Sequence, residues 1–481
     1  MLKLIIKQAN WSVLGTVFGF AIGFFVKIYL IDIVGLQAWG KYVIAQTFSS
    51  FVETVLSIGI PFVIIKFIPT FIENNKQKAS RIASIFLKYA IVVGSVFLAI
   101  VYFSSDLINK YIYNDVSGLN GILFLMCIHL PISMLFGVVL SLYRSVLKIK
   151  EIVLYGTFIA VTLRALLTFI IFQFTDDISH FILIEVCTQI LVLSILLYLF
   201  NKNEFSLFVT SESKEVTSDT KMIAYGKKMF LNSIITFISA WALSFIISIK
   251  LPSEDVGAYN ILLTLTGLTT FLLINLNRVF APAISKLYHE GNFFELGSLY
   301  KKTTFLINVL TIPLAIIIAT FADEILGLYT VEMLKYKDFL FFMLVGGMLS
   351  LAAGSSGTFM IMAGLEKKEL QLQTLKAVLI TGLAFAFVSE HKILAIVSLY
   401  VFFMLFINVS QLIYIKKNVS ISPFSKELVV LFLLAIFGMY FAINQSYNFK
   451  LIHFILIPIG VYLAYFFLML KPIKSLLKEL R

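Results

Sequence analysis

Residues 40–75 (GKYVIAQTFSSFVETVLSIGIPFVIIKFIPTFIENN) and residues 257–292 (GAYNILLTLTGLTTFLLINLNRVFAPAISKLYHEGN) resemble each other at an offset of 217 positions. Each stretch opens with glycine and tyrosine, continues as a long apolar run and ends in a charged turn. The identical pairs are Gly40/Gly257, Tyr42/Tyr259, Ile44/Ile261, Thr47/Thr264, Leu56/Leu273, Glu73/Glu290 and Asn75/Asn292. A duplicated block of membrane helices is typical of transporters, whose substrate site lies between the two copies.

The composition is that of an integral membrane protein. Hydrophobic residues make up 60% of the 481 residues and charged residues only 13%, more apolar surface than a soluble domain could bury. Apolar stretches of about the length that spans a bilayer recur along the whole chain, so we predict an all-α polytopic membrane protein. The expected transmembrane helices, about 14 in number, cover residues 10–33, 42–69, 82–104, 119–142, 152–174, 181–200, 229–249, 260–278, 303–321, 339–361, 374–389, 393–414, 428–443 and 451–470.

The basic residues predict the orientation. If the N-terminus is cytoplasmic, 25 of the 38 Lys and Arg residues lie in inside loops and tails, 7 in outside loops and 6 within spans. Acidic residues sort almost evenly, so the bias is that of the positive-inside rule. We therefore expect both termini to be cytoplasmic, and we attribute the net charge of +12 to topology rather than to nucleic-acid binding.

A polar stretch divides the chain. We predict an N-terminal lobe of six helices at 1–200, a cytoplasmic linker at 201–228 and a C-terminal lobe of six helices at 229–417. Residues 418–481 would add helices 13 and 14 and a cytoplasmic tail. Because six is even, the second copy enters the membrane in the same orientation as the first, which predicts a parallel tandem repeat.

Enzymatic chemistry has little support in this sequence. Residues Gly35 to Lys41 fit the phosphate-loop spacing, but Tyr42 replaces the Ser or Thr that would hold magnesium, and no strand precedes the motif. The two cysteines, Cys127 and Cys187, fall inside predicted spans, and no metal-ligand cluster or nucleophile–base arrangement emerges. We therefore expect a protein that is not an enzyme and that uses no cofactor, no catalytic residue and no bound metal.

Three glycines form a small-residue face on the first helix. Gly15, Gly19 and Gly23 follow one another at intervals of four residues. This spacing favours close helix packing, because small residues let backbones approach each other. It is also compatible with a pliable helix that bends during gating.

Charged residues inside the predicted spans are the candidate site. Glu53 and Arg164, with His129, lie roughly 15 Å below the outer boundary, and Lys27 roughly 9 Å below it. An ionised side chain at that depth costs about 2.5–3.5 kcal/mol or more, so it should face a partner or a water-filled cavity. Asp32 and Glu185 lie close to the outer boundary and are expected to be solvated. Spans 7–12 are expected to hold no deeply buried charge.

Two interpretations of these charges stay open. A Glu53–Arg164 ion pair could simply stabilise the first lobe. Alternatively, Lys27 and Arg164 form the cationic wall of a cavity that binds an anionic head group, and Glu53 or Asp32 holds a coupling cation. His129 is either a satisfied interior histidine or a polar residue of that cavity.

Several stretches resemble the polysaccharide flippase branch of the multidrug/oligosaccharidyl-lipid/polysaccharide exporter superfamily. The resemblance spans essentially the whole chain, and its motifs support the class better than the substrate. The stretches are Gly35-Leu-Gln-Ala-Trp-Gly40-Lys-Tyr42, Arg278-Val-Phe-Ala-Pro-Ala-Ile-Ser-Lys-Leu-Tyr-His-Glu-Gly-Asn292, Ala319-Thr-Phe-Ala-Asp-Glu-Ile-Leu-Gly-Leu-Tyr329 and Met362-Ala-Gly-Leu-Glu-Lys-Lys368.

The resemblance implies two six-helix lobes around a cavity, worked by alternating access. It implies a flippase that moves undecaprenyl-diphosphate-linked oligosaccharide from the inner to the outer leaflet of a bacterial cytoplasmic membrane, for surface polysaccharide such as O-antigen. Its partners would be this lipid-linked substrate, membrane lipids and a polysaccharide polymerase complex. Lys27 and Arg164 would fit the basic cavity residues common in this branch. The alternatives are a cation-coupled multidrug antiporter of the same superfamily and a membrane polymerase or ligase of lipid-linked sugars.

Overall fold

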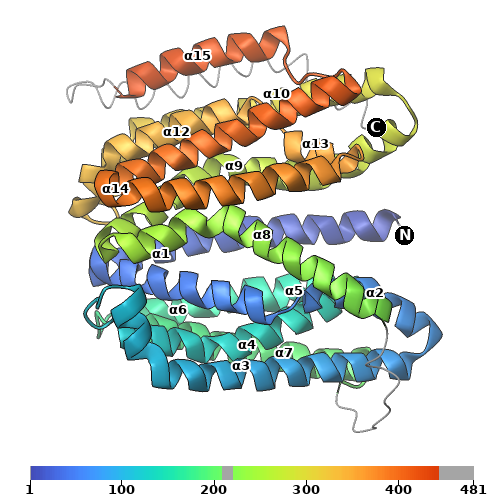
Figure 1. The fold of residues 1–481 in the computed structure, drawn as a ribbon, viewed down its shortest axis with the longest axis vertical. Coiled ribbons are helices and arrows are strands. Elements are labelled where there is room, and N and C mark those ends of the chain that lie inside the picture. Colours follow the sequence, from blue (N-terminus) through green and yellow to red (C-terminus); the bar gives the residue numbers. More distant parts are fainter. Residues whose placement is uncertain (1, 208–219, 444–481) are drawn as a thin grey trace. The chain divides into compact units, whose positions relative to one another are not determined.

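The structure is a computed structural model that describes residues 2–207 and 220–443 (Figure 1). Throughout these two ranges the regular elements are helices, and no strand occurs. The chain forms two compact units, residues 1–257 and 258–481. The predicted all-α membrane fold is confirmed.

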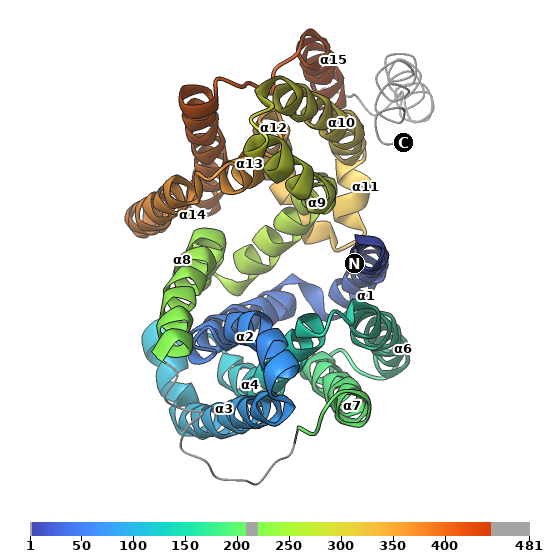
Figure 2. The ribbon, with the colours of Figure 1, turned by 90° about the vertical axis from the view of Figure 1, so that its right-hand side faces the viewer.

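The first unit is built from helices α1 to α8 and the start of α9. In this unit α4 packs against α2, α3 and α7 (Figure 2), while α1 packs against α4, α6 and α8. The elements are α1 (Leu2–Leu56), α2 (Ile60–Asn74), α3 (Lys76–Ile112), α4 (Leu119–Ser145), α5 (Ile149–Val153), the π-helix η1 (Leu154–Ile159), α6 (Ala160–Ile171), α7 (Ser179–Asn203), α8 (Thr220–Lys250) and α9 (Ser253–His289).

The described part of the second unit contains the rest of α9, six further α-helices and one 3₁₀ helix. Within it α10 packs against α12 and α15, and α12 and α13 both pack against α14. The elements are α10 (Phe293–Thr320), α11 (Ala322–Gly327), the 3₁₀ helix η3 (Val331–Tyr336), α12 (Lys337–Leu351), α13 (Ser356–Met362), α14 (Glu366–Val419) and α15 (Lys426–Ile443).

Eleven helices in the described ranges are long and apolar enough to cross a membrane. The helix α1, kinked at Gly35 (φ 80°, ψ 165°), contains the first predicted span and the start of the second. The helix α14, kinked at Lys392 (φ 50°, ψ −133°), contains two predicted spans. The predicted helix at 451–470 lies outside the described residues. The number fourteen and the cytoplasmic placement of both termini stay predictions.

The predicted lobe boundaries also stay a prediction. Compact packing divides the chain after Gly257, whereas the repeat predicts a linker at 201–228, of which residues 208–219 are not described. The difference arises because α8, the first helix of the second copy, packs against α1 and α2. A boundary drawn from duplication and a boundary drawn from packing therefore need not coincide.

The second predicted span is broken in its middle. Ile58 (φ 48°) and Gly59 (φ 72°) separate the end of α1 from α2. The Leu56 carbonyl accepts a hydrogen bond from the Tyr89 hydroxyl at 2.8 Å, so α3 satisfies a group at the broken end. Gly59 is required here because a Cβ would lie 2.8 Å from the Gly226 carbonyl oxygen of α8.

The repeated glycines make a reciprocal contact within the first unit. A Cβ on Gly40 would lie 1.7 Å from the Ser253 carbonyl oxygen, and a Cβ on Gly257 would lie 2.7 Å from the Leu36 carbonyl oxygen. Only glycine permits this approach of α1 to the first turn of α9. The Gly-X-Tyr echo in the sequence therefore has a packing cause, which applies to both copies.

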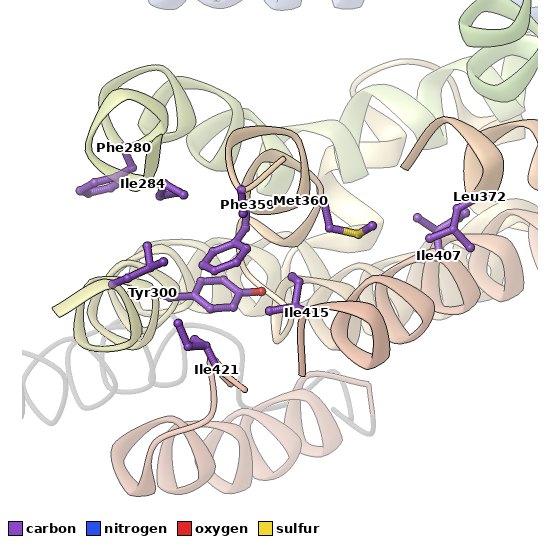
Figure 3. Close-up of a cluster of buried hydrophobic side chains, with 11 residues drawn as sticks. Phe280, Ile284, Tyr300, Phe359, Met360, Leu372, Ile407, Ile415 and Ile421 are labelled. Atoms are coloured by element: carbon purple, nitrogen blue, oxygen red, sulfur yellow. The ribbon is translucent and has the colours of Figure 1, made fainter. Parts of the chain in front are cut away.

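The second unit has a buried apolar cluster around Tyr300 and Phe359 (Figure 3). Their ring centroids are 4.8 Å apart, and the Tyr300 hydroxyl donates to the Ala353 carbonyl at 2.7 Å. Asn308 donates to the Leu351 carbonyl, also at 2.7 Å. Tyr300 and Asn308 both belong to α10, so this helix stabilises the non-helical segment 352–355 between α12 and α13.

Candidate functional site

A buried carboxylate on α7 is the centre of a charged cluster in the first unit. Glu185 is 8% exposed, and its two oxygens accept from two different helices. Arg164 of α6 donates through Nη1 to Oε1 at 2.9 Å, and the Tyr42 hydroxyl of α1 donates to Oε2 at 2.9 Å. Gln46, one turn after Tyr42, donates to that hydroxyl at 3.2 Å. These contacts join α1, α6 and α7 through one anionic group.

Lys27 approaches this cluster through an aromatic pair. Its Nζ lies 5.2 Å from the centroid of the Trp39 ring, within range of a cation–π interaction. Trp39 is stacked on Tyr42 with ring centroids 4.8 Å apart. The contacts therefore run in sequence from Lys27 through Trp39, Tyr42 and Glu185 to Arg164. The two basic residues predicted to form one cationic wall belong to one connected group.

His129 on α4 lies beside this group. Its Nδ1 is 3.1 Å from the Ser133 hydroxyl, one turn further along the helix. Its Nε2 is buried, and Arg164 Nε is buried without a hydrogen-bond partner among the described residues. The His129 ring lies near the Glu185 carboxylate and the Arg164 guanidinium. Arg164 thus retains an N–H donor that no acceptor among the described residues uses.

The other two predicted charged residues lie outside the cluster. Asp32 is exposed on α1, just before the Gly35 kink. Glu53 is half-buried in the last turn of α1 before the break, and no ion pair or side-chain hydrogen bond of Glu53 occurs among the described residues. The acidic partner of Arg164 is therefore Glu185 rather than Glu53. Any role of Asp32 or Glu53 with a coupling cation stays a prediction.

The expectation that Glu185 is solvated near the outer boundary is wrong. Depth along a helix was the only criterion available, and it ignores which face of the helix turns inward. Thr188, one turn after Glu185, is also buried and donates to the Glu185 carbonyl at 3.0 Å. A polar pair at i and i+3 in an apolar span is the sequence signal that could have indicated an inward-facing stripe.

Two of the three glycines of the first helix lie in close helix contacts, and the third does not. A Cβ on Gly15 would lie 2.7 Å from a methyl carbon of Val153, and one on Gly19 would lie 3.1 Å from the Thr157 methyl carbon. A Cβ on Gly23 would meet nothing within 4 Å. Gly15 and Gly19 thus let α1 approach α5 and η1 closely, while a gating role for the series stays a prediction. The kink in α1 occurs at Gly35 instead.

The second unit also contains a buried carboxylate, and it lies in the loop predicted between two spans rather than within one of the predicted spans 7–12. Glu369 is 8% exposed. Its oxygens accept from Gln411 Nε2, at 2.9 Å each, and from Gln373 Nε2 at 2.8 Å. The Ser356 hydroxyl in turn donates to Gln411 Oε1 at 2.7 Å. This network joins α13 to both halves of α14.

Hydropathy missed Glu369 because it placed this residue in the loop between two spans. In the structure α14 begins at Glu366, so the polar residues 369, 373 and 376 share one helix face by their i, i+4, i+7 spacing. That periodicity was readable in the sequence. It predicts a polar stripe that continues into the helix.

Replacing Gln411 by leucine is expected to destabilise the second unit. The substitution leaves the buried Glu369 carboxylate without its principal donor, a loss of about 1–3 kcal/mol or more for a charged group. Thermal unfolding of the purified protein in detergent should show a lower midpoint. Gln371→Leu is the matched control, because Gln371 is exposed on the same helix. Equal midpoints for the two variants would contradict a stabilising role for the network.

The comparisons with known proteins assign the chain to a family. A family model described as "Polysaccharide biosynthesis protein" matches residues 32–338, which is more than half of the chain. The chain belongs to this family. No curated protein matches the sequence. The predicted membership in a polysaccharide family is confirmed at the level of polysaccharide biosynthesis.

Several solved structures of membrane transporters are similar in fold to this chain. The lipid II flippase MurJ in its inward closed conformation has a TM-score of 0.72 at 15% identity, over 95% of this chain and 97% of that one. An inward-facing multidrug resistance MATE transporter of the MOP superfamily has a TM-score of 0.65 at 15% identity, over 88% and 95%. A MOP superfamily transporter from Pyrococcus furiosus gives 0.59 at 14%, over 87% and 96%. At these identities the likeness establishes the fold alone, a multi-pass helical membrane fold.

Proposed function

We propose that the protein is a flippase for undecaprenyl-diphosphate-linked oligosaccharide. It would move the sugar and the diphosphate from the inner to the outer leaflet of a bacterial cytoplasmic membrane by alternating access, while the lipid tail stays in the bilayer. Family membership supports the polysaccharide pathway, and the fold supports transport. The substrate, the alternating-access cycle and any association with a polymerase complex are parts of this proposal.

The observation that carries the proposal is the basic group of the first unit. A diphosphate cannot cross hydrocarbon without compensating charge. Arg164 is a guanidinium within a membrane-spanning helix, it has one acidic partner, and its Nε is buried without a hydrogen-bond acceptor in the described residues. Guanidinium groups bind phosphate oxygens through two parallel N–H bonds. Lys27, at the other end of the same chain of contacts, supplies a second positive charge.

The same feature favours an anionic cargo over a cationic drug. Of the charged side chains in this group, two are basic and one is acidic, and the acidic one is already paired with Arg164. A site for a cationic drug would instead hold an unpaired carboxylate within this group, where Glu185 is paired. The protein thus resembles the multidrug antiporters in its fold, but not in the chemistry of this site.

Lys27→Ala is expected to reduce export of lipid-linked oligosaccharide by about tenfold or more, since a lost charge-assisted contact of ~1.4 kcal/mol or more changes an equilibrium tenfold. The variant should reach wild-type levels in the membrane, because Lys27 contributes to a cation–π contact and not to an ion pair with Glu185. Complementation of a strain lacking the gene, scored by surface polysaccharide, measures the effect. Lys88→Ala is the matched control, since Lys88 is an exposed lysine of α3. Full complementation by Lys27→Ala would contradict the assignment of Lys27 to the site.

A further inference from the structure

The ion pair of the first unit is asymmetric in its accessibility. The Arg164 side chain retains 31% of its exposure, whereas the Glu185 side chain retains 11%. An incoming anion can therefore reach the guanidinium more easily than it can disturb the carboxylate. The guanidinium is also the half of the pair that a diphosphate would seek.

Glu185 does not depend on Arg164 alone. One of its oxygens accepts from Arg164 and the other accepts from Tyr42, which is itself held by the amide of Gln46. If Arg164 turns to another anion, the carboxylate keeps a hydrogen bond at its second oxygen. A buried carboxylate that loses all its partners would carry the full cost of desolvation, and this arrangement avoids that cost.

We propose that Glu185 is the resident counter-ion of Arg164, which the diphosphate of the substrate displaces on binding. This inference rests on the proposed function and extends it. While the site is empty, Glu185 neutralises Arg164 and fixes its position. When the substrate arrives, the guanidinium exchanges the carboxylate for phosphate oxygens, and Tyr42 stays with Glu185. Release of the cargo is then assisted by Glu185, which competes for Arg164 again.

This exchange makes Glu185 a positioning residue with a distinctive signature. A residue that only supports the shape of the site favours binding, so its removal weakens the affinity for the ligand. A competing counter-ion reduces affinity, so its removal should strengthen binding while it slows release and therefore transport. Tyr42 should behave in the opposite way, because without its hydroxyl the carboxylate is left with no partner once Arg164 departs.

The test measures binding of farnesyl diphosphate, a short-chain lipid diphosphate, to the purified full-length protein in detergent by calorimetry. Glu185→Gln keeps the shape of the side chain and is expected to bind about tenfold more tightly than wild type, equivalent to ~1.4 kcal/mol. Tyr42→Phe is expected to bind about threefold more weakly, a change of ~0.65 kcal/mol. In transport assays both variants should be slower than wild type.

The outcomes separate the inference from the function on which it rests. If wild type binds farnesyl diphosphate and Glu185→Gln binds it equally or more weakly, the counter-ion role is wrong and the proposed function stands. If wild type does not distinguish farnesyl diphosphate from farnesol, diphosphate recognition itself fails. Should Glu185→Gln not fold, Glu185→Asp keeps the charge but is one methylene shorter. It is then expected to bind about threefold more tightly, and unchanged or weaker binding would overturn the proposal.

Discussion

Arg164→Ala is expected to abolish export of lipid-linked oligosaccharide and to lower the amount of protein in the membrane. The two effects have one cause. The substitution removes the cation that binds the substrate's diphosphate, and it leaves Glu185 buried without its basic partner. Breaking a buried ion pair from one side costs about 3–5 kcal/mol, and the partial exposure of Arg164 places the expected loss at the lower end. Surface polysaccharide and immunoblots of membranes report the two effects separately.

Two further variants divide the structural effect from the functional one. Arg164→Lys keeps the charge opposite Glu185, so the membrane level should recover. Export should stay at about a tenth of wild type or less, because an ammonium cannot form the two parallel hydrogen bonds of a guanidinium. Arg144→Ala is the control for loss of an arginine, since Arg144 is exposed at the end of α4. Normal export by Arg164→Lys would show that bidentate recognition plays no part.

Gly40→Ala is expected to have the largest effect of any single methyl group added to the first unit. The new Cβ would lie 1.7 Å from the Ser253 carbonyl oxygen, and this neighbour is backbone that cannot rotate away. Either α1 or the first turn of α9 must shift, at a cost of about 3 kcal/mol or more. The amount of folded protein and its unfolding midpoint in detergent should both fall.

Gly23→Ala provides a matched control on the same helix. Its Cβ would meet no atom within 4 Å, so packing should not oppose the substitution. Alanine also favours a helix by about 1 kcal/mol over glycine, so this variant should be neutral or slightly more stable. If the two variants behave alike, the close approach of α1 to α9 at Gly40 is not required for folding.

The fold could be predicted from the sequence because the bilayer imposes it. Apolar runs of spanning length must become helices, since a backbone in hydrocarbon has to satisfy its own hydrogen bonds. The first predicted span ends at residue 33, close to the kink in α1 at Gly35, which adopts a positive φ that other residues rarely adopt. The break at Ile58 and Gly59 was not predicted, because the apolar run continues across it. Gly59 and Pro61 are local signals for a break. The partners at the break, Tyr89 of α3 and Gly226 of α8, come from elsewhere in the chain.

Several residues of the candidate site could be predicted from the sequence, but the partners with which they form hydrogen bonds and ion pairs could not. Lys27, Arg164 and His129 were recognisable as charged or titratable residues at membrane depth. The partners Tyr42 and Glu185 are 143 residues apart, and only the packing of α1 against the bundle brings them together. Hydropathy also treats every residue of a span alike. It therefore placed Glu185 in solvent and Glu369 in a loop, although both carboxylates face inward.

The central claim is that the basic group of the first unit recognises a lipid diphosphate during transport. Its most direct test is the movement of an undecaprenyl-diphosphate-linked oligosaccharide across the membrane of vesicles that contain the purified protein. The account predicts that wild type transfers the sugar to the opposite leaflet and that Arg164→Lys, present at the same density, transfers it at about a tenth of that rate or less. Equal rates for the two proteins would contradict the account.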